Sequence, residues 1–150
     1  MAREISLTSL VTEVDANLPA ATLIQDPEGN AFTFYKYKGT LAYREADFTE
    51  EKLAHKFKVS VTRGYHLVLE MSEDDDISEF IRPGVIPPEA FDSNELKEKQ
   101  SEVLEPYKEP GEFLVVEEAF RLVFYIRTLG VPACLQDYLS RGKLSVLKIV

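Results

Sequence analysis

The run FKVSVTRGYHLVLEM occupies residues 57–71, and the expected fold depends on how it is interpreted. Two β-prone segments flank Arg63-Gly64, which is typical of a β-hairpin. A two-residue loop would mix polar and apolar side chains on both faces. A three-residue loop, with Gly64 in the left-handed conformation, gives one apolar face. The strand pairs are then Val61 with Tyr65, Val59 with Leu67 and Phe57 with Leu69.

A second hairpin is expected nearer the N-terminus. The β-prone runs Ala21–Gln25 and Ala31–Lys38 are separated by Asp26-Pro27-Glu28-Gly29-Asn30, which are favourable turn residues. Gly39-Thr40 allows another turn into a third strand, Leu41–Glu45. These segments favour a sheet in which neighbouring strands run antiparallel.

Helical spacing and capping residues predict the remaining elements. Apolar residues recur at helical spacing in 5–18. Thr49 is a suitable N-cap for a helix over 49–57, and Asp92-Ser93-Asn94-Glu95 forms a capping box for 93–105. Two more helices, 113–129 and 132–141, precede a strand over 144–150. We therefore predict an α+β fold, with a mainly antiparallel sheet of two hairpins plus a C-terminal strand, packed against a C-terminal helical segment.

The length of 150 residues fits a single α+β domain, residues 1–150. An acidic, proline-rich loop at 72–92 could divide it into sub-lobes 1–71 and 93–150. The chain has no run of about 18 apolar residues, and its start lacks the apolar core of a signal peptide. We expect a cytoplasmic protein without a membrane partner.

The formal net charge is −9, and it is concentrated in one part of the chain. Residues 70–112 hold 14 of the 26 acidic residues but only 4 of the 17 basic ones. Binding to duplex nucleic acid requires clustered basic residues, so this class of partner is excluded. The acidic segment could be a solvated face. Alternatively, it could bind a protein partner with a basic surface.

The acidic, proline-rich loop also carries apolar residues, and apolar anchors within a charged rim are typical of a binding patch. The predicted partner-binding residues are Asp74, Asp75, Asp76, Glu79, Phe80, Ile81, Val85, Ile86 and Phe91. The favoured function is a non-catalytic protein–protein interaction protein, such as an accessory subunit, an inhibitor or an immunity-type binder. The alternative is a homo-oligomeric structural subunit of a larger assembly, such as a virion.

No motif predicts a catalytic residue, a metal or a cofactor. Asp74, Asp76 and Ser78 match the first ligands of a calcium loop, but the required Gly and final Glu are absent. The single cysteine, Cys134, is expected to be a buried apolar residue. In the predicted hairpin His66 lies opposite Ser60, so an enzyme without a recognisable motif remains a further alternative.

A single-stranded nucleic-acid binder is the last alternative. It would use Lys36, Lys38 and Arg44 among the aromatic residues of the first hairpin.

Overall fold

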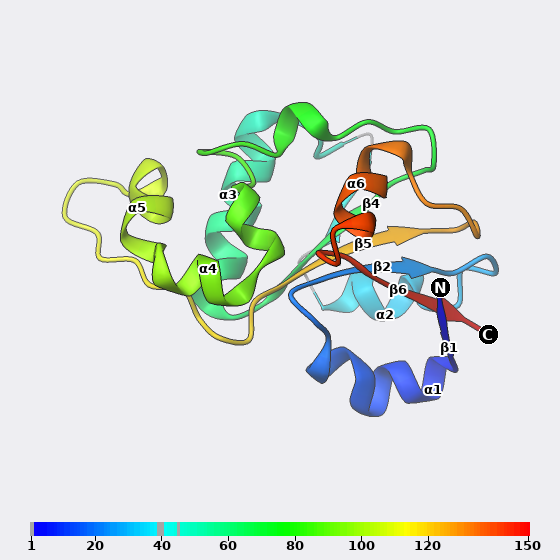
Figure 1. Cartoon of the computed structure of the whole chain (residues 1–150). Coiled ribbons are helices and arrows are strands. Elements are labelled where there is room, and N and C mark those ends of the chain that lie inside the picture. The colour runs from blue at the N-terminus through cyan, green and yellow to red at the C-terminus, as the bar shows by residue number, and fades with distance from the viewer. Residues whose placement is uncertain (1, 39–40, 45) are drawn as a thin grey trace.

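The computed structural model describes residues 2–38, 41–44 and 46–150. Within these residues six strands form one sheet, in which every pair of neighbours is parallel (Figure 1). The strand order is β1-β6-β2-β5-β4-β3. The strands are β1 (Arg3–Ile5), β2 (Ala21–Gln25), β3 (Leu41–Ala42), β4 (His66–Glu70), β5 (Arg121–Ile126) and β6 (Ser145–Ile149). The fold is therefore α/β, and the predicted α+β fold with a mainly antiparallel sheet is wrong.

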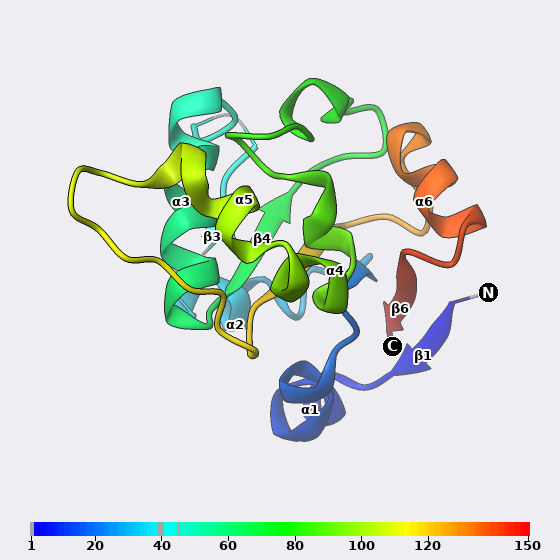
Figure 2. The same ribbon diagram turned by 60° about the vertical axis from the view of Figure 1, so that its left-hand side comes forward.

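Helices cover both faces of the sheet, as Figures 1 and 2 show from two directions. One face carries α1 (Leu7–Ser9), which continues through helical turns at Leu10–Val14 and Asp15–Asn17, and α2 (Phe32–Tyr37). The other face carries α3 (Glu50–Arg63), α4 (Ser93–Glu98), α5 (Gln100–Leu104) and α6 (Gln136–Ser140). Short 3-10 turns on this second face are Ser78–Phe80, Pro88–Phe91, Glu105–Tyr107 and Ala133–Leu135.

Alternating strand residues supply two apolar cores. In β4, Leu67 and Leu69 pack with Phe57 of α3, whereas Val68 packs with Tyr35 of α2. A parallel strand covered on both faces is apolar along its whole length. This explains why Arg121–Ile126, predicted to be helical, is the central strand β5.

Both predicted hairpins are wrong, although each contains one correct strand. Residues 57–63 are the second half of α3, and only 66–70 form a strand. Gly64 does have a left-handed φ of 73°, but it ends α3 instead of turning a hairpin. In the N-terminal hairpin β2 is as predicted, whereas Phe32–Tyr37 is helical.

Several local predictions are confirmed. The Thr49 side chain accepts the Lys52 N–H at the start of α3, and Asp92 accepts two N–H groups at the start of α4. The C-terminal strand forms as β6, between β1 and β2. The predicted turn at 39–40 and the strand end at residue 45 lie outside the described residues. No helix in the described part of the chain is long and apolar enough to cross a membrane.

Strands on both sides of the acidic loop belong to the same sheet, because β4 pairs with β5 over five residues. The loop itself contains the two 3-10 turns Ser78–Phe80 and Pro88–Phe91. The acidic loop therefore connects two neighbouring strands of one continuous sheet.

Candidate functional site

The acidic residues of the predicted partner-binding set lie on the surface. Asp74, Asp76 and Glu79 are exposed, whereas Asp75 is half-buried and ion-paired with Arg44. One Asp75 oxygen accepts Arg44 Nη2 at 2.8 Å. The Arg44 bond lowers the pKa of Asp75, and a hydrogen bond to Ser78 lowers the pKa of Asp76. Both carboxylates are therefore held in their charged form.

The apolar residues of the same set are placed differently from the prediction. Val85, Ile86 and Phe91 are buried, so they cannot serve as exposed anchors. Phe91 stacks against the ring of Tyr138, with 3.9 Å between centroids. Phe80 and Ile81 are half-buried against the same core. The role of the loop in binding stays a prediction.

The sequence analysis missed an exposed apolar segment at residues 113–116. Phe113 is 86% exposed and Val115 37% exposed, whereas Val116 is buried and Leu114 partly buried. This alternation is the pattern of an extended strand with one face on its own core. The outer face thus presents two apolar side chains to solvent.

The main chain of this segment is also available for pairing. Among the described residues, no hydrogen bond involves the N–H or C=O groups of Phe113, Leu114 or Val115. The segment is nevertheless anchored where it ends. The Val116 N–H donates to Gln100 Oε1 at 3.0 Å, and Lys97 Nζ donates to the Val116 carbonyl at 3.0 Å. Residues 113–115 therefore form an edge without a neighbouring strand.

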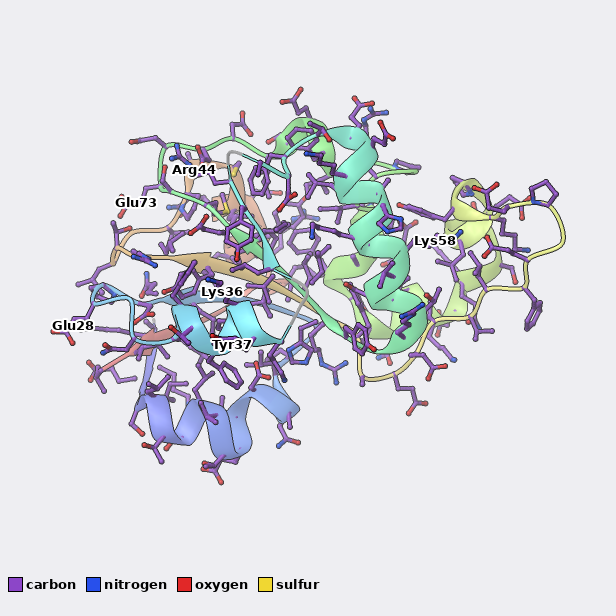
Figure 3. All side chains as sticks on the ribbon, turned by 180° about the vertical axis from the view of Figure 1, so that it is seen from behind. Glu28, Lys36, Tyr37, Arg44, Lys58 and Glu73 are labelled. Atoms are coloured by element: carbon purple, nitrogen blue, oxygen red, sulfur yellow. The ribbon has the colours of Figure 1, made fainter. Side chains whose placement is uncertain are left out.

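Acidic residues flank the exposed segment on both sides. Glu109 and Glu112 precede it, and Glu117 and Glu118 follow it. Glu112 is bonded to Lys58 of α3 at 2.6 Å, and this bond lowers the pKa of Glu112. In Figure 3 Glu73 lies near the left end of the molecule, whereas Lys58 lies well to its right, on α3. The 113–116 segment and the 72–80 acidic run are therefore separate surfaces.

The predicted pairing of Ser60 with His66 is wrong. Ser60 lies on α3, on one side of the sheet, and His66 starts β4 and faces the other. His66 Nδ1 lies 3.4 Å from the carboxylate of Asp15, which also accepts Lys38 Nζ at 2.8 Å. Burial raises the pKa of Asp15, but the bonds to His66 and Lys38 outweigh it, so the net pKa is lowered.

The basic residues of the nucleic-acid alternative do not lie on one strand. Lys36 is on α2, Lys38 follows that helix and binds Asp15, and Arg44 binds Asp75 (Figure 3). The aromatic strand that would stack bases is therefore not formed. Burial raises the pKa of the half-buried Cys134 thiol. The described residues contain no group of three side chains able to hold a metal ion.

No known protein family matches the sequence, no curated protein is significantly similar to it, and no solved structure matches it significantly.

Proposed function

We propose that this protein is a non-catalytic binding protein, and that residues 113–116 pair with an extended segment of a basic protein partner. The observation that supports this most directly is the combination found at Phe113 and Val115. Their side chains are exposed and apolar, and their main-chain groups make no hydrogen bond among the described residues. Addition of a partner strand would bury both the side chains and the main chain.

The charge around the segment selects the partner. Glu109, Glu117 and Glu118 are exposed beside the apolar residues. A partner strand with Lys or Arg at its ends would place opposite charges across the interface. The acidic residues of the 72–80 run would add long-range attraction for the same basic partner.

The same charges disfavour pairing between two copies of the chain. In an antiparallel pair with residue 115 opposite residue 115, which keeps the exposed side chains of both copies on one face, Glu112 of one copy lies opposite Glu118 of the other. Like charges directly opposite each other destabilise a strand pair. We therefore expect the free protein to be monomeric.

Fluorescence anisotropy with labelled peptides tests the proposal. The basic probe is Lys-Val-Thr-Val-Thr-Val-Lys, and the matched acidic probe has Glu at both ends. We expect the basic probe to bind and the acidic probe to bind much more weakly. A basic probe with N-methylated alternate amides should not bind, because it cannot complete the main-chain ladder.

Two substitutions complete the test. Phe113→Ser should weaken binding by roughly tenfold, because it removes most of the apolar area that pairing buries. Tyr37→Ser is the matched control, since Tyr37 is 82% exposed but lies on α2. Equal binding of both probes, or equal effects of both substitutions, would contradict the proposal. A homo-oligomer in light scattering that Phe113→Ser dissociates would favour the assembly subunit instead.

A further inference from the structure

A second candidate site lies at the carboxyl ends of three parallel strands. A cleft of about 520 Å³ is formed where β3, β4 and β5 end. Its lining includes Tyr43, Arg44, Glu70, Met71 and Arg127. Open parallel sheets bind ligands outside the carboxyl ends of their strands, and this volume suits a small organic molecule.

Arg127 supplies a positive charge whose position is defined. Its guanidinium carbon lies 4.5 Å from the ring centroid of Phe32, which is a cation–π distance. It also packs against Gly29, where an added Cβ would lie 3.4 Å from the guanidinium. Among the described residues, Arg127 forms no ion pair with a carboxylate.

Glu70 supplies a negative charge on the neighbouring strand. It is half-buried, and its carboxylate has no hydrogen bond or ion pair within the described ranges. Glu70 is in register with Tyr125, so Arg127 lies two residues further along on the same face of the sheet. Strand geometry puts the two Cα atoms roughly 8 Å apart. The opposite charges thus line one cleft without pairing.

Arg44 has a different place in the cleft. Its guanidinium is bonded to Asp75, so the acid offsets most of its charge. Figure 3 shows Arg44 at the same end of the sheet as Glu28 and Glu73. Tyr43 provides apolar surface in the same cleft, whereas Met71, which also lines it, is almost fully buried. Among the described residues that line the cleft, Arg127 and Glu70 are therefore a cation and an anion without an ion-pair partner.

We propose that this cleft binds the zwitterion of a free α-amino acid with an apolar or aromatic side chain. The Arg127 guanidinium donates hydrogen bonds to the carboxylate, because its two parallel N–H groups match the two carboxylate oxygens. Glu70 accepts hydrogen bonds from the ammonium group, and the side chain lies against Tyr43. This site is separate from the strand surface at 113–116, and neither proposal depends on the other.

The charge balance favours a zwitterion over a phosphate ester. A phosphate brought to Arg127 would also face the carboxylate of Glu70, and like charges repel at this range. An α-amino acid satisfies both groups at once, because its ammonium and carboxylate groups are attached to the same carbon atom. A neutral ligand would leave the half-buried Glu70 carboxylate without a compensating charge.

Isothermal titration calorimetry on the full chain tests the site with four matched probes. They are L-phenylalanine, 3-phenylpropionate without the amine, phenethylamine without the carboxylate, and adenosine monophosphate. We expect L-phenylalanine to bind with a Kd on the order of 1 mM or tighter. Each of the two truncated analogues should bind at least about tenfold more weakly.

Two variants assign the two charges separately. Arg127→Gln should remove the preference for L-phenylalanine over phenethylamine, because the carboxylate has then lost its partner. Glu70→Gln should remove the preference for L-phenylalanine over 3-phenylpropionate. The matched controls are Arg141→Gln, whose guanidinium lies 5.1 Å from the ring of Tyr138 on α6, and Glu13→Gln, an exposed acid in the helical turn after α1. Both controls should bind like the unsubstituted protein.

Three results would overturn the assignment. The first is no heat with L-phenylalanine, L-leucine or L-methionine at 10 mM, roughly ten times the expected Kd. The second is tighter, Arg127-dependent binding of adenosine monophosphate, which would make the cleft a phosphate site. The third is equal effects of Arg127→Gln and Arg141→Gln. If Arg127→Gln fails to fold, the binding of the four probes to the unsubstituted protein still tests the assignment.

Discussion

The Tyr125 hydroxyl donates a 2.6 Å hydrogen bond to the carboxylate of Asp26, and both side chains are fully buried. The two residues belong to neighbouring strands, since Asp26 follows β2 and Tyr125 is in β5. The same carboxylate accepts the N–H groups of Asn30 at 3.1 Å and Ala31 at 2.7 Å. Asp26 therefore fixes the turn that leads into α2.

Substitution of Tyr125 and substitution of Asp26 should lower the free energy of unfolding by different amounts. Tyr125→Phe loses one hydrogen bond to a charged group, and we expect it to lower the free energy of unfolding by about 1–3 kcal/mol. Asp26→Ala leaves two N–H groups and a hydroxyl unpaired, so a loss of at least about 3 kcal/mol is expected. Urea denaturation measures both, with the exposed Tyr37→Phe as control. An Asp26→Ala variant as stable as Tyr125→Phe would show that the turn does not depend on this carboxylate.

Alanine substitutions at Gly64 and Gly142 distinguish the cost of backbone strain from the cost of side-chain crowding. Both have left-handed φ angles, 73° and 72°. A Cβ at Gly64 would lie 3.3 Å from the Cβ of Glu117, whereas nothing lies within 4 Å at Gly142. We expect Gly142→Ala to cost roughly 1 kcal/mol of unfolding free energy, from backbone conformation alone. Gly64→Ala should cost more, and equal losses in thermal or urea unfolding would argue against crowding.

The buried strand β5 shows why periodicity failed to identify the sheet. The apolar run around Arg121–Ile126 suits either a helix packed on most sides or a parallel strand covered on both faces. Only neighbouring strands can distinguish the two, and these lie far away in the sequence. The Arg63-Gly64 pair was similarly ambiguous, because glycine in the left-handed region ends helices as readily as it turns hairpins.

Local signals were more informative than the pattern of apolar residues. Thr49 and Asp92 cap helices as predicted, because an N-cap needs only its own first turn. By contrast, the burial of Phe91 depends on Phe124 and Tyr138, which the sequence does not place beside it. The exposure of Phe113 was missed for the same reason, since an apolar residue gives no sign of whether another element covers it.

Ser60 carries a buried hydroxyl that makes no hydrogen bond among the described residues. We expect Ser60→Ala to leave the free energy of unfolding unchanged or to raise it by up to about 1 kcal/mol, because an unpaired polar group is removed from the core. Val61→Ala, at the adjacent buried position, should instead cost about 1–3 kcal/mol and shows that the assay is sensitive. A large loss in Ser60→Ala would mean that the hydroxyl has a bonding partner, such as a buried water.

Asp15 should make stability depend on acid pH. Its pKa in the folded protein is lowered below the ordinary 3.8, because the bonds to His66 and Lys38 outweigh the effect of burial. A depressed carboxyl pKa stabilises the folded state above the unfolded pKa, and this contribution is lost as pH falls through the folded value. The unfolding free energy should therefore decrease below about pH 4, towards the lowered folded-state pKa.

Asp15→Asn tests this expectation, because it removes the titrating carboxylate while keeping an oxygen that can accept from Lys38. At pH 7 the variant should be less stable by roughly 1–3 kcal/mol, since a charged hydrogen-bond partner is lost. Its disadvantage should shrink as pH falls below 4, because protonation removes the same charge from the unsubstituted protein. Asp137→Asn, at an exposed carboxylate on α6, should instead keep the pH dependence of the original chain. Urea unfolding at pH 7, 5, 4 and 3 gives the comparison, and a constant difference between Asp15→Asn and the original chain would rule out the depressed pKa.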